Sequence, residues 1–210
     1  MTDEKKETER IRLIYDRRSA DERSRSGGAD LRWLCSQAYG ETLEVGIGRG
    51  RTLPFYASSV HLSAIELSPV ALEGARRRAR ELGREANLRL GDASELPYPD
   101  EHFDTVLFSF SLCTIPNDRA AIAEAVRVLR PLGRLALVEH VRSPRFVIRG
   151  LERLAEPLTV RCQGDHLLRD PLDHILAEEM EVEYLERRML GLVERLVARK
   201  PEDNDLAQAV

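Results

Sequence analysis

The sequence predicts an α/β fold, in which a mostly parallel β-sheet lies between two layers of helices. Three observations support this prediction. From residue 42 onward, short apolar runs alternate with amphipathic segments of helical period. The helical segments carry start and stop signals, and a glycine-rich turn follows the first apolar run directly. With 210 residues, 42% of them hydrophobic, the chain is long enough for one domain with a sizeable core.

Seven segments have the composition expected of β-strands. Most are rich in β-branched and apolar residues and too short for helices, and turn-forming residues flank them. Five belong to the alternating part of the chain, and the last two would close the sheet near the C-terminus. The expected strands cover residues 42–47, 61–66, 87–90, 104–109, 134–141, 181–188 and 192–199.

Two helices between these strands have clear end signals. Ser68 is a good N-cap, and Pro69 suits the first helical position, so a helix should begin there and stop near Gly83. Asn117 would cap a second helix, which the Pro131-Leu132-Gly133 turn should end. These signals fix where the intervening strands begin and end.

The strand–helix alternation breaks after residue 142. Two helical patterns, about 145–160 and 171–179, are joined by a short polar segment and predict a helical cap insertion at about 142–179. The domain itself should span residues 31–200. Residues 1–30 are expected to form an N-terminal arm over the ligand site, and residues 201–210 a flexible tail.

Charge and composition exclude several functional classes. With 32 basic and 36 acidic residues, the net charge is −4, which disfavours nucleic acid as a partner. The three cysteines include no Cys-x-x-Cys pair, which argues against disulfides and structural zinc. The N-terminus is highly charged and no apolar run reaches 18 residues, so we expect a cytoplasmic protein with no membrane span. The sequence leaves open peripheral membrane contact and the oligomeric state.

The first strand runs into the most informative motif of the chain. Glu44 is followed by Gly46, Gly48 and Gly50, which allow a sharp turn and a close approach of backbone to a ligand. The next strand ends at Glu66, where nucleotide-binding sheets hold ribose hydroxyls. The pattern therefore predicts a ligand that contains a nucleoside.

The glycine spacing bears on which nucleoside ligand is expected. A dinucleotide fingerprint requires Gly-x-Gly-x-x-Gly, whereas here position 51 is Arg, and no Gly-Lys-Ser/Thr phosphate loop is present. Glu44 would also repel a phosphate group. These features favour a cationic nucleoside ligand over NAD or a nucleotide triphosphate.

Four segments in this order resemble the class I S-adenosylmethionine (SAM) dependent methyltransferases. They are Glu44-x-Gly46-x-Gly48-x-Gly50, Glu66, Gly91-Asp92-Ala93 with the Leu96–Asp104 stretch, and Val106–Phe110. A fifth, Val128–Leu135, resembles "V-L-[KR]-P-G-G-x-L", except that Leu132 replaces a glycine. The resemblance implies a Rossmann-like three-layer sandwich with seven strands, the last of them antiparallel.

The same resemblance implies a set of cofactor contacts. Glu44 would contact the amino end of SAM beside the glycines, Glu66 its ribose hydroxyls, and Asp92 the adenine amino group. Tyr15, in a Tyr-Asp segment of the arm, would lie near the sulfonium or else anchor the arm to the core. The implied cofactor-binding residues are Tyr15, Glu44, Gly46, Gly48, Gly50, Glu66, Leu67, Asp92, Ala93, Ser109 and Phe110. The expected product is S-adenosylhomocysteine, and no metal is required.

Within that family, the chain is similar to type 11 methyltransferases, namely the quinone C-methyltransferases and phospholipid N-methyltransferases. Residues 110–116 and 164–170 more weakly resemble small thiol methyltransferases. The chain departs from these proteins at Glu179-Met180-Glu181, where Ala-Gly-Phe is usual. The resemblance thus implies a small-molecule acceptor: a thiol, quinol, amine or lipid head group.

Two histidines are candidate catalytic groups. His140 ends the fifth strand and has the pKa range of a general base, but a structural role fits it equally well. His166 and Arg169 would line the acceptor pocket or bind an anionic head group, or else form a surface or helix-capping arrangement. Neither histidine has the spacing of a metal ligand. Two alternatives to methyl transfer stay open: a non-catalytic SAM-binding regulator and an NAD-dependent oxidoreductase, which Arg51 disfavours.

Overall fold

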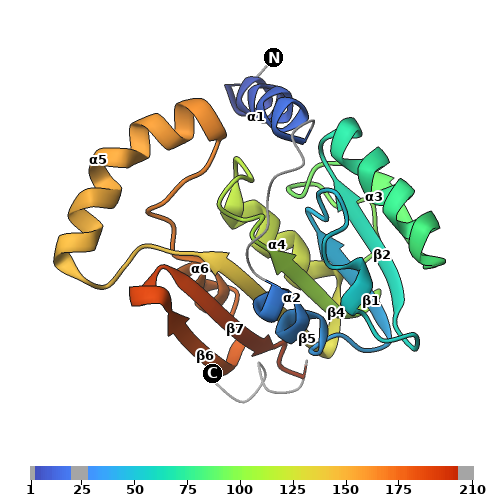
Figure 1. Ribbon diagram of the computed structural model, residues 1–210. Helices are drawn as coiled ribbons and strands as arrows, with labels where there is room; N and C mark the ends of the chain where they lie inside the picture. The colour runs from blue at the N-terminus through green and yellow to red at the C-terminus, as the bar shows by residue number, and fades with distance from the viewer. Residues whose placement is uncertain (1–2, 20–27, 203–210) are drawn as a thin grey trace.

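The computed structural model describes residues 3–19 and 28–202, and its centre is a seven-stranded sheet (Figure 1). The strand order is β3-β2-β1-β4-β5-β7-β6, and β7 runs antiparallel to both of its neighbours while the other six strands are parallel. The predicted α/β fold with an antiparallel last strand is confirmed. The strands are β1 (Glu41–Val45), β2 (His61–Glu66), β3 (Asn87–Leu90), β4 (Phe103–Ser109), β5 (Leu129–His140), β6 (Glu181–Arg188) and β7 (Val193–Arg199).

Helices cover both faces of the sheet and form the outer two layers. Helices α4 and α6 pack on one face, whereas α2 and α3 pack on the other. Helix α1 crosses one end of the sheet, and α5 extends away from it (Figure 1). The helices are α1 (Asp3–Ser19), α2 (Gly28–Cys35), α3 (Pro69–Leu82), α4 (Asp118–Val128), α5 (Phe146–Gln163) and α6 (Pro171–Ala177), with short 3-10 turns η1 (Leu53–Phe55) and η2 (Met189–Gly191).

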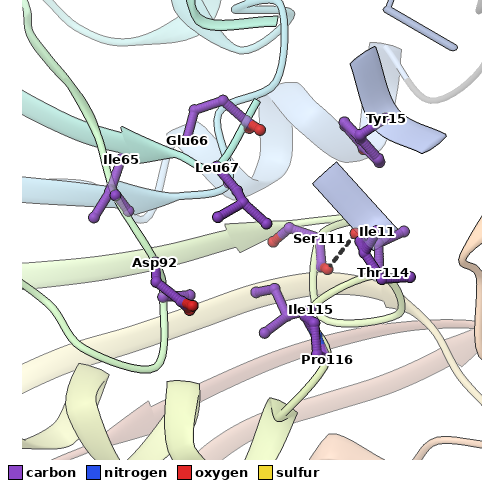
Figure 2. Close-up of a pocket in the computed structure, with 13 residues that line it drawn as sticks. Ile11, Tyr15, Ile65, Glu66, Leu67, Asp92, Ser111, Thr114, Ile115 and Pro116 are labelled. Carbon is purple, nitrogen blue, oxygen red and sulfur yellow. Dashed lines mark hydrogen bonds between the residues drawn. The ribbon is translucent and has the colours of Figure 1, made fainter. Parts of the chain in front are cut away.

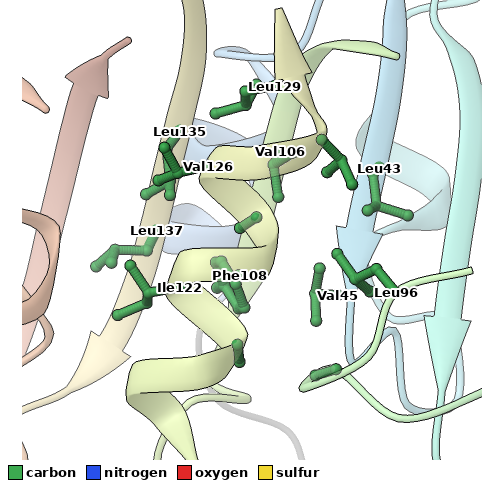
Figure 3. Packing of buried hydrophobic residues seen from close by; sticks show 14 of the residues in the cluster. Leu43, Val45, Leu96, Val106, Phe108, Ile122, Val126, Leu129, Leu135 and Leu137 are labelled. Carbon is green, nitrogen blue, oxygen red and sulfur yellow. The ribbon is translucent and has the colours of Figure 1, made fainter. Parts of the chain in front are cut away.

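The larger core lies between the sheet and α4 (Figure 3). Leu43 and Val45 of β1 meet Val106 and Phe108 of β4, and Ile122 of α4 packs over them. These side chains are buried because alternate residues of each strand point to this face. The intervening residues of the same strands form the second core beneath α2 and α3. The two cores hold the strand ends, and hence the site, in place.

The predicted capping signals act as expected in both helices. Ser68 Oγ accepts a hydrogen bond from the Ala71 amide at 3.0 Å, and Gly83 ends α3 in the left-handed conformation. Asn117 caps α4 through the Ala120 amide at 3.0 Å. Such bonds satisfy amides that the first helical turn leaves without partners.

Some boundaries differ from the sequence prediction. Helix α4 ends at Val128, because β5 already begins at Leu129 and pairs with Phe103 before a register shift. The expected N-terminal arm contains a helix, α1, and α2 was not predicted at all. Of that arm, residues 1–2 and 20–27 lie outside the described residues, as do residues 203–210 of the expected tail.

Candidate active site

A pocket opens at the carboxyl edge of the parallel strands, beneath α1 (Figure 2). The space within it, including its open mouth, is about 480 Å³. Its walls come from α1, the ends of β1 and β2, the segment after β3 and the loop after β4. The lining residues are Ile11, Tyr15, Gly46, Ile65, Glu66, Leu67, Gly91, Asp92, Ala93, Ser111, Thr114, Ile115 and Pro116.

The three glycines after β1 all have positive φ but differ in their surroundings. A Cβ added to Gly46 would lie 2.6 Å from Ser111 Cβ, and one added to Gly50 would lie 2.4 Å from Leu53 Cδ1. Gly46 and Gly50 are therefore required by packing. A Cβ on Gly48 would meet no atom within 4 Å. Gly48 is thus the position where the loop leaves open space.

Glu66 ends β2 at the rim of the pocket and is 4% exposed. Its Oε2 accepts a hydrogen bond from the Gly48 amide and its Oε1 one from the Ser68 amide, each at 2.8 Å. Burial raises the pKa of Glu66, while the bonds from these amides act in the opposite direction. The side chain is consequently fixed in one orientation, and each oxygen retains a lone pair for a ligand.

The segment after β3 forms the next wall. Asp92 Oδ1 accepts a hydrogen bond from the Ser94 amide at 2.9 Å, and Ala93 lies beside it in the pocket wall. A Cβ added to Gly91 would lie 2.5 Å from Ile65 Cδ1, so the Ile65 side chain would have to shift. Two carboxylates, from the ends of neighbouring strands, therefore border the same pocket.

The opposite wall is the loop after β4, which we call the β4 loop (Ser111–Pro116). Glu139, fully buried at the end of β5, accepts hydrogen bonds from the Ser111 amide at 2.6 Å and the Leu112 amide at 2.9 Å. Burial raises the pKa of Glu139 to about 7, against the lowering effect of these amides. Thr114 Oγ1 closes the loop by donating to the Ser111 carbonyl (Figure 2).

Arg169, from the insertion, holds the β4 loop from the other side. Its guanidinium donates to the carbonyls of Leu112 and Ile115 and, at 3.0 Å, to that of Pro116. The Arg169 side chain is only 13% exposed and lies 3.5 Å from Asp118. Arg169 thus shapes the pocket wall without lining the pocket, which corrects the expectation that it contacts the acceptor or lies at the surface.

Helix α1 covers the pocket with Ile11 and Tyr15 (Figure 2). Its position is held at two points. Ser68 Oγ donates a 2.5 Å hydrogen bond to Asp16, and Arg10 donates to the Val160 carbonyl of α5 at 2.9 Å. Helix α1 therefore bridges α3 and α5 above the pocket.

Glu44 does not line the pocket, although the sequence pattern places it there. It is fully buried on the α2/α3 face of the sheet, where its Oε2 accepts hydrogen bonds from Thr52 at 2.7 Å and Tyr56 at 2.9 Å. Its Oε1 has no hydrogen-bond partner among the residues that the structure describes. Burial raises the pKa of Glu44 to about 7. Glu44 therefore binds side chains that follow the glycine turn and does not face the pocket.

The two candidate catalytic histidines also lie outside the pocket lining. The ring of His140 packs against Phe110, with 4.8 Å between ring centroids. His166 lies 3.6 Å from Glu156, and its backbone amide donates to the Cys113 carbonyl at 2.8 Å. Burial lowers the pKa of both histidines. The contacts of both histidines are consistent with a structural role.

The sequence-predicted cofactor residues thus divide into two groups. The pocket brings together Tyr15, Gly46, Glu66, Leu67, Asp92 and Ala93, whereas Glu44, Gly48, Gly50, Ser109 and Phe110 do not line it. Sequence reasoning missed seven lining residues. They are Ile11, Ile65, Gly91, Ser111, Thr114, Ile115 and Pro116. Gly91 and Ile65 adjoin predicted residues, so the strand-end rule could have found them; the β4 loop carries no comparable signal.

The residues around this site are similar to a known protein family. Residues 43–137, which run from within β1 to within β5, match the family model described as "Methyltransferase domain". The match spans 95 of the 210 residues of the chain, so this part of the chain is similar to a methyltransferase domain. The match covers the glycine turn, Glu66 and Asp92, and it ends before the insertion.

About half of the chain is also similar to proteins that are named methyltransferases. The chain is 36% identical over 116 residues to phosphatidylethanolamine N-methyltransferase of Cereibacter sphaeroides, covering 54% of this chain and 57% of that protein. It is 35% identical over 108 residues to demethylmenaquinone methyltransferase of Tropheryma whipplei, covering 51% and 44%. The aligned part is thus about half the length of these relatives.

A solved structure confirms the Rossmann-like fold over most of the chain. Geranyl diphosphate methyltransferase in complex with SAM superposes with a TM-score of 0.67 at 17% identity, covering 82% of this chain and 84% of that one. At this identity the likeness shows the fold alone.

No helix among residues 3–19 and 28–202 is both long and apolar enough to cross a bilayer. No cluster of three or more His, Cys, Asp or Glu side chains suited to a metal ion was found in the same residues.

Proposed function

We propose that the chain binds SAM in the pocket beneath α1 and transfers its methyl group to a small-molecule acceptor. The observation that carries the proposal is the pair of carboxylates, Glu66 and Asp92, which border one pocket next to a glycine turn with open space at Gly48. The methyltransferase domain match over the same residues supports it.

The residues present fit this cofactor. Glu66 is oriented by two backbone amides and retains lone pairs that can accept bonds from ribose hydroxyls. At Gly48 the space that a Cβ would occupy is free, so the ligand can approach the backbone. Asp92, on the neighbouring wall, would accept from the adenine amino group. The carboxylates also favour a cationic ligand.

SAM, when bound, supplies a sulfonium-activated methyl group that needs no further activation by the protein. The tasks of this chain are therefore to orient the reactants and to exclude water. Ile11 and Tyr15 of α1, together with Ile115 of the β4 loop, would close an apolar cover over the pocket. The proposal assigns no proton transfer to His140 or His166, because neither lines the pocket.

We infer that the acceptor is an apolar small molecule of the lipid or quinol class. The pocket lining beyond Glu66 and Asp92 is mainly apolar, and Ile11, Leu67 and Ile115 lie near one another in it (Figure 2). The relatives named above act, by their names, on a phospholipid and a quinone precursor. A thiol or amine acceptor is the alternative outcome of the same assay.

The first test is calorimetric titration with SAM, S-adenosylhomocysteine and NAD. Wild type should bind the first two, and Glu66→Ala should bind SAM at least about tenfold more weakly, because two charge-assisted hydrogen bonds to ribose are lost. Glu81→Ala, on the exposed face of α3, is the matched control. NAD binding without SAM binding would overturn the proposal.

A methyl-transfer screen then tests the acceptor class. Quinols, phospholipids, amines and thiols are each incubated with the chain and labelled SAM, and methylated product is measured. Turnover with a quinol or lipid is the expected result. SAM binding with no turnover on any acceptor would instead indicate a SAM-binding regulator.

A further inference from the structure

Helix α5 presents an apolar face that nothing in the described chain covers. The helix extends away from the sheet (Figure 1). Phe146 is 82% exposed and Leu154 is 80% exposed, values usual for charged rather than apolar side chains. The exposed apolar face consists of Phe146, Val147, Leu151, Leu154 and Leu158. With 18 residues, α5 is about 27 Å long, so this face is an extended surface rather than a single exposed side chain.

The acidic residues and the exposed basic residues of α5 have different surroundings. Both acidic residues turn toward the body of the protein: Glu152 accepts from the Ser143 amide at 3.0 Å, and Glu156 accepts from the Leu167 amide at 2.6 Å. The exposed charges are all basic. Arg145 at the N-cap, Arg153 and Arg161 are exposed and form no ion pair within residues 3–19 and 28–202.

The apolar surface continues onto the adjacent turn η2. Ser143, which precedes α5, donates a 2.9 Å hydrogen bond from Oγ to the Leu190 carbonyl, so this turn lies beside the start of the helix. Met189 and Leu190 are 69% and 55% exposed. The helix and the turn together offer apolar side chains, with arginines along the helix and no exposed acid on it.

We propose that α5, with the tip of η2, docks the protein onto an anionic lipid bilayer surface. An apolar helix face with basic flanking residues lies in the interface plane of a bilayer: the apolar side chains enter the acyl boundary, and the arginines meet lipid phosphates. The aliphatic stems of Arg153 and Arg161 allow their guanidinium groups to reach the head groups from within the apolar face. The inference is independent of the proposed methyl transfer.

A second copy of the chain is a less suitable occupant of this face. In a symmetric pair, the same surface faces itself, so the unpaired arginines of one α5 would lie against those of the other. No exposed acid of the helix is available to offset that repulsion. An anionic surface offers the complementary charge instead.

Cys162 allows this proposal to be tested without altering the face. It lies in the last turn of α5 and is exposed, whereas Cys35 and Cys113, the other cysteines of the sequence, are buried. An environment-sensitive fluorophore attached to Cys162 should shift to the blue when phosphatidylcholine vesicles containing phosphatidylglycerol are added. The matched control carries Cys162→Ser and Arg78→Cys, with the fluorophore on the exposed face of α3, and should show no shift.

Vesicle sedimentation with substituted chains identifies the groups responsible. Replacing Leu151 and Leu154 by Ser should abolish binding, whereas Val70→Ser with Leu82→Ser on α3 should leave it unchanged. Arg153→Gln with Arg161→Gln should weaken binding to anionic vesicles roughly 30-fold. Arg77→Gln with Arg78→Gln is the matched control, and circular dichroism confirms that each variant is folded.

Three results would overturn the proposal. The first is wild-type protein that remains in the supernatant with anionic vesicles. The second is binding that the Leu151 and Leu154 substitutions do not affect. The third is a dimer in size-exclusion chromatography that these substitutions dissociate while vesicles have no effect, which would assign the face to a second copy.

Discussion

The two walls of the pocket are built in different ways. On the β2 side, Glu66 is held by amides only 2 and 18 residues away, those of Ser68 and Gly48. On the other side, the β4 loop is held by Glu139, 27 and 28 residues away, and by Arg169, 53 to 57 residues away. The first wall depends on local backbone geometry and the second on distant side chains.

This difference predicts how substitutions in each wall affect ligand binding and folding. The bonds to Glu66 come from backbone amides in the turns after β1 and β2, so they form wherever these turns form, and substitution of Glu66 should change ligand binding more than folding. The β4 loop has its carbonyls and amides bonded to two buried charged groups, whose loss leaves polar groups unsatisfied. Substitution of Glu139 or Arg169 should therefore affect folding stability more than ligand binding.

The largest effect is expected for Arg169→Ala. Removal of this guanidinium leaves the carbonyls of Leu112, Ile115 and Pro116 without their donor and Asp118 without a nearby charge. The free energy of unfolding should fall by about 4 kcal/mol, measured by chemical denaturation. Arg142→Ala is the matched control: the Arg142 side chain is 45% exposed and Asp170 keeps its ion pair with Arg187, so the loss should be less than about 1 kcal/mol. Equal losses in both variants would refute the comparison.

A smaller, pH-dependent effect is expected for Glu139→Gln. Because burial raises the pKa of Glu139 from 4.5 to about 7, the folded state holds this proton more tightly than the unfolded state. The contribution of Glu139 to the free energy of unfolding of the wild type should therefore decline as the pH rises from about 4.5 to about 7. The uncharged variant avoids this loss, so its stability relative to wild type should rise across that window by up to roughly 3 kcal/mol.

Denaturation at pH values below and above this window measures the effect. Glu124→Gln provides a control of opposite sign, because hydrogen bonding to Arg127 lowers the pKa of Glu124. That carboxylate stabilises the folded state above its unfolded pKa, so its variant should lose stability relative to wild type as the pH rises. The same slope in both variants would contradict the burial argument.

The smallest effect on stability, and a specific one on binding, is expected for Gly48→Ala. Alanine at φ +58° costs about 1 kcal/mol, and the added Cβ meets no atom of the chain within 4 Å, so it would enter the space through which the proposed ligand approaches the backbone. SAM affinity in calorimetry should therefore fall. Gly83→Ala matches it closely, with φ +61° and open space at the end of α3, and should lose similar stability while SAM affinity stays unchanged.

Much of the fold could be predicted because its signals are local. The caps Ser68 and Asn117 and the apolar strand runs are readable within a few residues, and Glu66 and Asp92 follow their strands directly. Glu44 shows the limit of a motif alone. Strand alternation turns it to the face opposite Leu43 and Val45, away from the pocket, and this rule could have corrected the expectation.

The shape of the β4 loop and the position of α1 over the pocket could not be predicted from the sequence, and the reason is physical. The loop takes its shape from Glu139 and Arg169, and no local pattern shows that these side chains meet it. Helix α1 is strongly polar, and its position depends on Ile11 packing near Gly164 and on the Asp16 bond to Ser68. Contacts between distant segments become visible only once the chain is folded.

A continuous chain of hydrogen bonds joins the pocket to its cover. Glu66 accepts from the Ser68 amide, and the Ser68 hydroxyl donates to Asp16 of α1. A ligand that bonds Glu66 therefore acts on the same network that holds α1. The coupling is reciprocal by thermodynamic necessity: the factor by which such a ligand favours one position of α1 is the factor by which that position raises the affinity for the ligand.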